Sequence, residues 1–204
     1  MDRRHFLAAT AAAALTGVAA PAQAAPISLN ELSRYLNALG SAEADFTQIN
    51  NDGTISTGRL YIQRPGRARF DYAEPEETLV MAGGGQVAIF DGKSNVATPE
   101  TYPLAQTPLN IILESNVDLA RRNMVVGHRE EGPKTIVTAQ DPERPEIGQI
   151  ELVFTGNPTQ LRQWVITDQN GTETTVVLGD MTTGSSLRAS LFNIPNEVRR
   201  RRGD

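Results

Sequence analysis

Residues 58–75 read GRLYIQRPGRARFDYAEP, and this stretch predicts the core of the fold. On a β-strand, every second residue points to the same face. The first half of the stretch alternates in this way through Leu60, Ile62 and Arg64. After a Pro65-Gly66 turn, the second half alternates through Ala68, Phe70 and Tyr72. The pattern therefore indicates two antiparallel strands. The same pattern places the guanidinium of Arg64 at the end of an apolar strand face. This position is unfavourable unless the guanidinium has hydrogen-bonding partners.

The first 24 residues have the features of an export signal. Arg3-Arg4 precedes an alanine-rich apolar run at 6–20, and Ala22-Gln23-Ala24 has the small-x-small cleavage pattern, so we expect the mature chain to begin at Ala25. The order R-R-x-F-L at 3–7 fits a twin-arginine signal, and a general signal with two arginines is the alternative. Either signal predicts the periplasm. The chain has no cysteine that could carry a lipid anchor.

Composition limits the possible chemistry. Residues 25–204 suffice for a single domain with a sizeable core. The whole chain carries 19 Lys and Arg against 24 Asp and Glu, a net charge of −5, which disfavours nucleic acid as a partner. Without cysteine, and with His128 as the one histidine after the signal, a thiol nucleophile and a His-rich zinc site are excluded. A Ser-His-Asp triad would need His128, which lies in a strand beside charged residues. We therefore expect no enzyme, no metal and no cofactor.

Two segments have helical patterns. Ser28 and Glu31 form a capping box, and an apolar stripe with spacings of three and four ends before Gly40: Leu29, Leu32, Leu36 and Leu39. The second segment lies within 99–122, where Thr107-Pro108 resembles a helix start. It is followed by a short apolar face: Leu109, Ile112 and Leu113. A helix this short requires tertiary packing.

The rest of the chain has the period of β-strands. We predict strands near 42–50, 54–64, 67–73, 77–82, 86–91, 93–98, 123–129, 134–140, 147–155, 160–167, 172–180 and 187–193. Asn170-Gly171 marks the clearest hairpin. Short strands and tight turns indicate a curved, mainly antiparallel sheet or barrel, with helices against an apolar face. The tail 196–204, with Arg199–Arg202, is expected to be mobile and solvated. Contact with anionic lipid headgroups is the alternative.

The order of these features resembles one family, the periplasmic lipoprotein carriers called LolA. The resemblance covers nearly all of the chain after the signal. It rests on the amphipathic first helix and on these motifs: Phe46-Thr47-Gln48, Gly58-x-Leu60, Arg64-Pro65, Phe70 with Tyr72, Pro75, Asp91, Thr107-Pro108, Asp168-x-x-Gly171 and Phe192-x-x-Pro195. Phe70 stands where members often have tryptophan.

The resemblance implies an unclosed antiparallel β-barrel of about eleven strands, with a helical lid over a hydrophobic cavity. It implies a monomeric carrier that takes lipoproteins from the inner-membrane transporter LolCDE to the outer-membrane acceptor LolB, where an acceptor exists. Arg64 would latch the lid. The lid side chains would be Leu29, Leu32, Leu36, Leu109, Ile112 and Leu113. The cavity for acyl chains would be lined by Phe46, Leu60, Ile62, Phe70, Val80 and Phe90. A regulatory module that senses lipid or lipoprotein with the same fold is the alternative.

Overall fold

The computed structural model describes residues 25–94, 96–121 and 123–203. The predicted export signal, residues 1–24, lies outside these ranges. Within them, no helix has the length and apolar character needed to cross a membrane.

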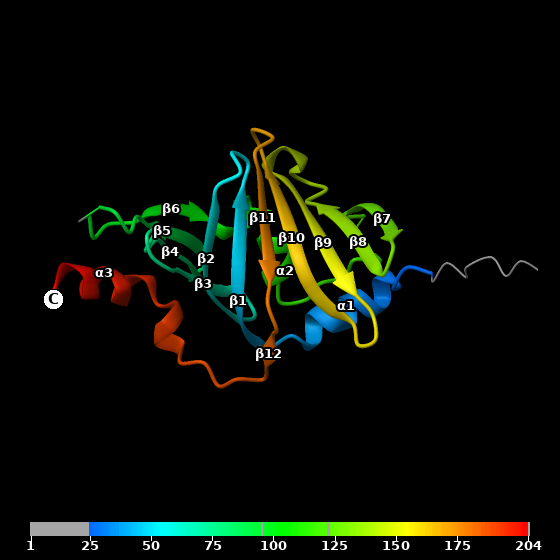
Figure 1. Cartoon of the computed structure of the whole chain (residues 1–204), viewed down its shortest axis with the longest axis horizontal. Coiled ribbons are helices and arrows are strands. Elements are labelled where there is room, and N and C mark those ends of the chain that lie inside the picture. Colours follow the sequence, from blue (N-terminus) through cyan, green and yellow to red (C-terminus); the bar gives the residue numbers. More distant parts are fainter. Residues whose placement is uncertain (1–24, 95, 122, 204) are drawn as a thin grey trace, which may run out of the picture.

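The described residues form one antiparallel sheet of twelve strands (Figure 1). The strands are β1 Ser41–Asn50, β2 Ile55–Gln63, β3 Arg67–Tyr72, β4 Leu79–Gly83, β5 Gln86–Phe90, β6 Glu100–Pro103, β7 Val125–Glu131, β8 Lys134–Gln140, β9 Gly148–Thr155, β10 Gln160–Asp168, β11 Glu173–Leu178 and β12 Thr182–Thr183. Their order is β6-β5-β4-β3-β2-β1-β11-β10-β9-β8-β7, with β12 beside β1. The sheet ends at β6 and β7, so it is an open barrel, as predicted.

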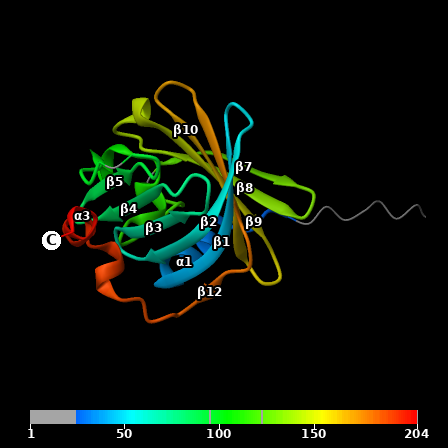
Figure 2. The ribbon, with the colours of Figure 1, turned by 60° about the vertical axis from the view of Figure 1, so that its left-hand side comes forward.

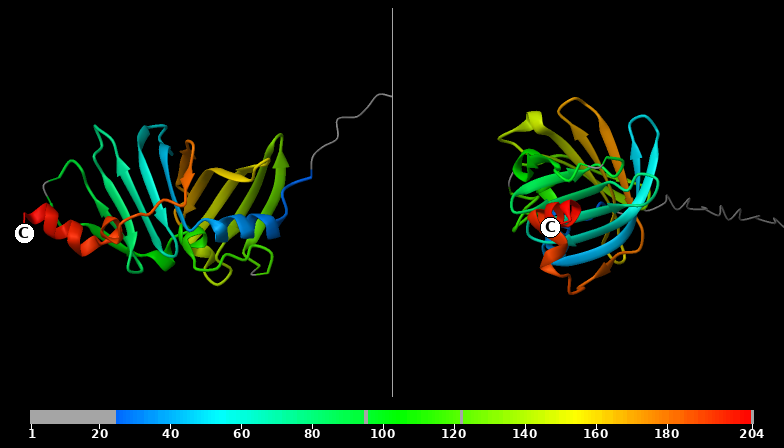
Figure 3. Two further views of the ribbon diagram at one scale, coloured as in Figure 1. Left: turned by 90° about the horizontal axis from the view of Figure 1, so that it is seen from below. Right: turned by 90° about the vertical axis from the view of Figure 1, so that its left-hand side faces the viewer.

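The sheet curves strongly, and the right-hand view of Figure 3 shows it almost end-on. Helix α1, Leu29–Ala38, lies against the concave face (Figure 2). The Ser28 half of its predicted capping box is present, because the Ser28 side chain accepts a hydrogen bond from the Glu31 N–H at 3.3 Å, whereas the Glu31 carboxylate accepts from the Thr159 hydroxyl. Helix α2, Asn110–Leu113, is a single turn with Leu109 as its N-cap, so the predicted start at Thr107-Pro108 was two residues too early. Both helices belong to the same apolar core as the concave face of the sheet.

Glycine is required at one position of the central hairpin. A Cβ on Gly58 would lie 2.2 Å from the Asp71 carbonyl oxygen and 2.8 Å from the Phe46 ring. The bare backbone of β2 therefore allows Phe46 to lie directly against it. The Asn170-Gly171 hairpin is also confirmed, since it joins β10 to β11 with a positive φ of 77° at Gly171.

Both faces of β4 and β5 are covered. Val80, Ala82 and Val87 belong to the concave core or pack against it. The alternate residues form a second cluster on the opposite face: Leu79, Met81, Ala88 and Phe90. Phe90 therefore does not line the concave side, and that prediction was wrong.

Helix α3, Ile194–Arg202, covers this second cluster with Ile194 and Val198. The Glu197 side chain is only 7% exposed and accepts hydrogen bonds from Arg200 and Arg201. The Arg201 guanidinium lies 4.7 Å from the centroid of the Phe90 ring. The prediction of a mobile tail at 196–204 was therefore wrong for the described part, because its helix buries Glu197 and packs the partly buried Val198 against the second cluster.

Two predicted strands also differ. No strand forms at 93–98 among the described residues, and the edge strand β6 follows at Glu100–Pro103 instead. Residues 187–193 contain the 3₁₀-helix η3, Ala189–Phe192, which leads into α3. In both places, proline or glycine close by limits regular pairing.

Candidate functional site

Arg64 lies where the central hairpin meets both helices. It follows the last residue of β2, and its backbone N–H donates to the Gly40 carbonyl just after α1, at 2.8 Å. Two residues later, the Gly66 N–H donates to the Leu113 carbonyl at the end of α2, also at 2.8 Å. The β2–β3 turn thus touches the C-terminal ends of both helices.

The Arg64 side chain joins the same two helix ends. Its Nη1 donates to the Leu36 carbonyl in the last turn of α1. Its Nη2 donates to the Glu114 carbonyl at the C-cap of α2, and to Asn37 Oδ1 at 3.3 Å. The last carbonyls of a helix have no partner inside the helix, and a cation is favourable near them. One planar guanidinium therefore bridges two elements that are far apart in the sequence.

This position is unfavourable for the charge. The Arg64 side chain is half-buried, and burial lowers the pKa of its guanidinium, an effect that the negative charge of Glu114 partly offsets. Its Nε is buried without a hydrogen-bond partner among the described residues. The contacts of Arg64 with the helix ends therefore act against a desolvation penalty, which limits their net strength.

Two further polar side chains of α1 hold the segment that follows α2. The Asn37 amide donates to the Val117 carbonyl at 2.8 Å and accepts from the Val117 N–H at 2.9 Å. Ser33 Oγ accepts from the Leu119 N–H at 3.0 Å and donates to the Leu29 carbonyl at 2.8 Å. Our sequence analysis missed both residues. Ser33 and Asn37 are four residues apart beside the leucine stripe, so they lie on the same side of α1. This spacing is the sequence signal that could have identified them.

The candidate lid and lining residues meet in one apolar core. The buried members from the helices are Leu32, Leu36, Leu109, Ile112 and Leu113, and those from the strands are Phe46, Leu60, Ile62 and Phe70. Leu29 and Val80 pack against them from the margin. Phe46 makes edge-to-face contacts with Phe70 and Tyr72, at centroid distances of 5.6 and 5.0 Å. Trp164, which the sequence analysis left without a role, contacts Phe70 from β10 at 6.2 Å.

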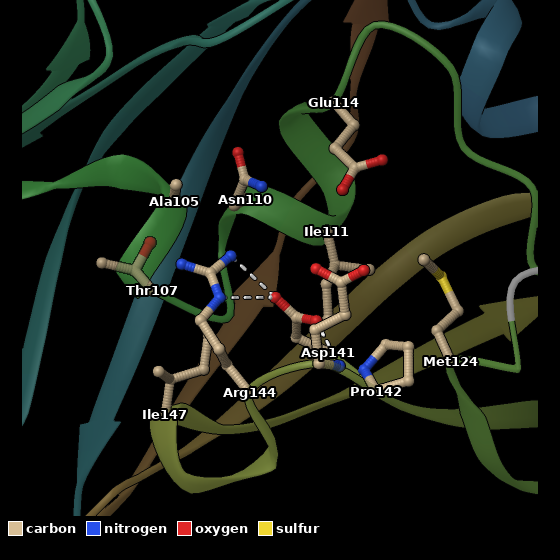
Figure 4. A pocket seen from close by; sticks show the side chains of 11 residues that line it. Ala105, Thr107, Asn110, Ile111, Glu114, Met124, Asp141, Pro142, Arg144 and Ile147 are labelled. Carbon is tan, nitrogen blue, oxygen red and sulfur yellow. Dashed lines mark hydrogen bonds and ion pairs between the residues drawn. The ribbon is translucent and has the colours of Figure 1, made fainter.

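Two adjoining pockets lie beside α2, with volumes of about 350 and 550 Å³, and the smaller one extends to the C-cap residue Glu114. We call them together the rim groove. They share Thr107, Arg144 and Ile147, and lie between η1 (Leu104–Gln106) with α2 on one side and the β8–β9 connection on the other. Figure 4 shows the smaller pocket, where the Arg144 guanidinium bonds Asp141 at 2.8 Å and faces α2.

The described residues contain no cluster of three or more His, Asp or Glu that could hold a metal ion. The ring of His128 is exposed, and its Nε2 lies 3.0 Å from the Ile27 carbonyl oxygen, at the start of the described chain.

The fold and the site define a class of protein: an open antiparallel barrel whose apolar concave face is covered by two helices and clasped by an arginine. The comparison with known families agrees with it. The chain belongs to the family described as outer membrane lipoprotein carrier protein LolA, whose model matches residues 37–195. Proteins of this family are carriers and not enzymes.

Two relatives are named outer-membrane lipoprotein carrier proteins. The protein from Chromobacterium violaceum is 27% identical over 189 residues, which cover 90% of this chain and 89% of that protein. The protein from Methylococcus capsulatus is 26% identical over 183 residues, 86% of each chain. A solved domain from Vibrio parahaemolyticus matches with a TM-score of 0.52 at 10% identity, covers 84% of this chain and 98% of that domain, and supports the fold alone.

Proposed function

We propose that this protein is a periplasmic carrier that shields the acyl chains of lipoproteins and takes them from the inner to the outer membrane. The observation that carries the proposal is the clasp of Arg64 on the ends of α1 and α2, over an apolar concave face. The family and the names of the relatives support the choice of cargo.

The apolar core supplies the site for the acyl chains. Each buried CH₂ contributes about 0.8 kcal/mol, so complete burial of several long chains would make release extremely slow. The side chains of α1 and α2 fill the concave face themselves. Cargo and lid would then compete for the same surface. This competition lowers the net affinity to a range in which the carrier both loads and unloads.

Arg64 sets the balance between the two states. While the lid is closed, its guanidinium holds both helix ends, and these hydrogen bonds are lost when α1 and α2 separate from the β2–β3 turn. A hydrogen bond to a charged group contributes about 1.5–3 kcal/mol when well formed. The clasp therefore favours the closed, empty state and assists unloading.

The partners follow from this cycle. The protein would receive lipoproteins from an inner-membrane transporter of the LolCDE type, which supplies the energy, and deliver them to LolB where that acceptor exists. It would act as a monomer, after removal of residues 1–24.

The test is a release assay with bacterial spheroplasts. Purified residues 25–204 are added, and a lipoprotein is expected in the soluble fraction, bound to the protein. The matched control is the same lipoprotein with its acylated cysteine changed to serine, which should not be retained. Recovery of all the acylated lipoprotein in the membrane fraction, or equal retention of the serine form, contradicts the proposal.

A further inference from the structure

We propose that acyl chains pass into the concave core through the rim groove, and that the groove then holds the ester-linked glycerol and first peptide units of the lipid anchor. This inference rests on the carrier function proposed above. It assigns a second site on the lid, which meets the Arg64 clasp at Glu114.

The larger pocket of the groove borders the core. Val87 and Leu109 line it, and both also belong to the concave core. Ile166 of β10 lines it as well and packs against the same core. Its outer wall is Tyr102 on the edge strand β6, whose side chain is 47% exposed. A chain lying in this pocket would therefore touch the apolar interior at one end and solvent at the other.

The smaller pocket has a charged lining, in which Arg144 lies with the acidic residues Glu114, Asp141 and Glu143. Arg144 donates to Asp141 from both Nε and Nη2, at 3.2 and 2.8 Å. Asp141 also accepts from the Glu143 N–H at 2.9 Å. Burial alone would raise the pKa of Asp141, but these hydrogen bonds outweigh it and lower the pKa. The carboxylate thus stays charged and fixes the guanidinium toward α2, where Asn110 also lines the pocket (Figure 4).

The larger pocket combines apolar residues of the core with Glu146 and Asp168, and together with the charged smaller pocket it fits an amphiphile of one kind. Ester and peptide groups offer carbonyl oxygens, and Arg144 and Asn110 are hydrogen-bond donors for such acceptors. Acyl chains have no polar group and are excluded from this end, so they extend through the larger pocket toward Leu109. The glycerol of a diacyl anchor joins both parts and would lie where the pockets meet, at Thr107, Arg144 and Ile147.

The lid segment beside the groove is bound locally. The backbone N–H groups of Thr107, Asn110 and Ile111 donate to carbonyls at 104–108, within the same segment. The other end of α2 is held by Arg64 and by the Gly66 N–H. The N-terminal end of α2 could then move aside, with loss of the core packing of Leu109 and Ile111, while Arg64 still holds the C-terminal end. Passage through the groove and release of the clasp become separate steps.

The experiment uses a photo-crosslinking residue at Gln106, which is exposed and lines the larger pocket. The control position is Lys134, which lines a pocket of similar size, about 540 Å³, at the N-terminal end of α1. The probe is a synthetic dipalmitoyl lipopeptide with a fluorescent label. We expect a soluble complex with crosslinks at position 106 and not at 134. A soluble complex without crosslinks at 106 overturns the groove and leaves the carrier function intact, whereas failure to form any complex overturns both.

A second measurement compares two partly exposed ion pairs. Arg144→Ala removes the donor of the groove, and Arg129→Ala removes the partner of Glu151, at 2.9 Å, on the other side of β9. Both pairs are surface pairs that add little to stability. We expect Arg144→Ala to weaken lipopeptide binding about tenfold, as for a lost charged hydrogen bond, and Arg129→Ala to change it less than about twofold. Equal effects of the two substitutions would overturn the proposal.

Discussion

Arg64→Leu is the substitution that separates the clasp from ordinary packing. It removes two hydrogen bonds to the Leu36 and Glu114 carbonyls and keeps an apolar side chain at the end of β2. Because the guanidinium is half-buried, we take about 1 kcal/mol for each bond, or about 2 kcal/mol in total. This corresponds to about a 30-fold shift of the lid toward its open form.

The shift has a defined sign for binding. In the carrier cycle proposed above, cargo binds the open form, so the apparent affinity falls in proportion to the fraction of protein that is open. Arg64→Leu is therefore expected to bind a fluorescent dipalmitoyl lipopeptide up to about 30-fold more tightly, and to release it to acceptor liposomes more slowly by a similar factor. Arg64→Lys keeps the charge but has no planar fork to reach two carbonyls, so its affinity should lie between the two.

The matched control is Arg34→Leu, an exposed arginine of α1 on the same lid. It should leave lipopeptide affinity and release unchanged. If Arg64→Leu folds normally by circular dichroism and still binds and releases the probe within about twofold of the unmodified protein, the reasoning from the clasp is refuted.

Three further substitutions test other parts of the structure. Asn37→Ala removes both bonds to Val117 and should destabilise the protein by about 2 kcal/mol, lowering the Tm by about 6 °C in thermal unfolding. Phe90→Ala should cost about 3 kcal/mol in urea unfolding but leave lipopeptide affinity unchanged, because Phe90 packs under α3 and away from the concave core. Burial alone would raise the pKa of Glu197, but hydrogen bonds from two arginines outweigh it and hold the pKa below the ordinary value of 4.5. The stability it contributes is therefore present above that value and lost as the pH falls through the folded-state pKa, so Glu197→Gln should flatten the acid-side loss of stability in urea titrations.

Each of these has an outcome that contradicts it. An unchanged Tm for Asn37→Ala would mean that the hydrogen bonds between Asn37 and Val117 add nothing to the stability of the protein. If the folded Phe90→Ala variant binds the lipopeptide more weakly, Phe90 contributes to the acyl-chain site after all. For Glu197→Gln, a stability profile in acid that matches the unmodified protein would remove Glu197 as the titrating group.

Local pattern was sufficient for the elements that alternate or repeat on their own. The leucine spacing of α1 and its Ser28 cap, the alternation around Leu60 and Ile62, and the Asn170-Gly171 turn are properties of neighbouring residues, and all three are found in the structure. Pattern was insufficient for β5. Val87, Ala88 and Phe90 are all buried there, and alternation alone does not tell which of the two faces is concave.

Arg64 shows most clearly the difference between what local sequence predicts and what tertiary packing decides. The sequence by itself determined that a guanidinium ends an apolar strand face and needs partners, because a strand has period two and a buried charge needs hydrogen bonds. Only the tertiary structure decided that those partners are carbonyls 28 and 50 residues away, at the ends of two helices. It also placed α3, more than a hundred residues along the chain, over Phe90. Which elements meet is decided by burying all apolar faces at once, and no local stretch of the chain contains that information.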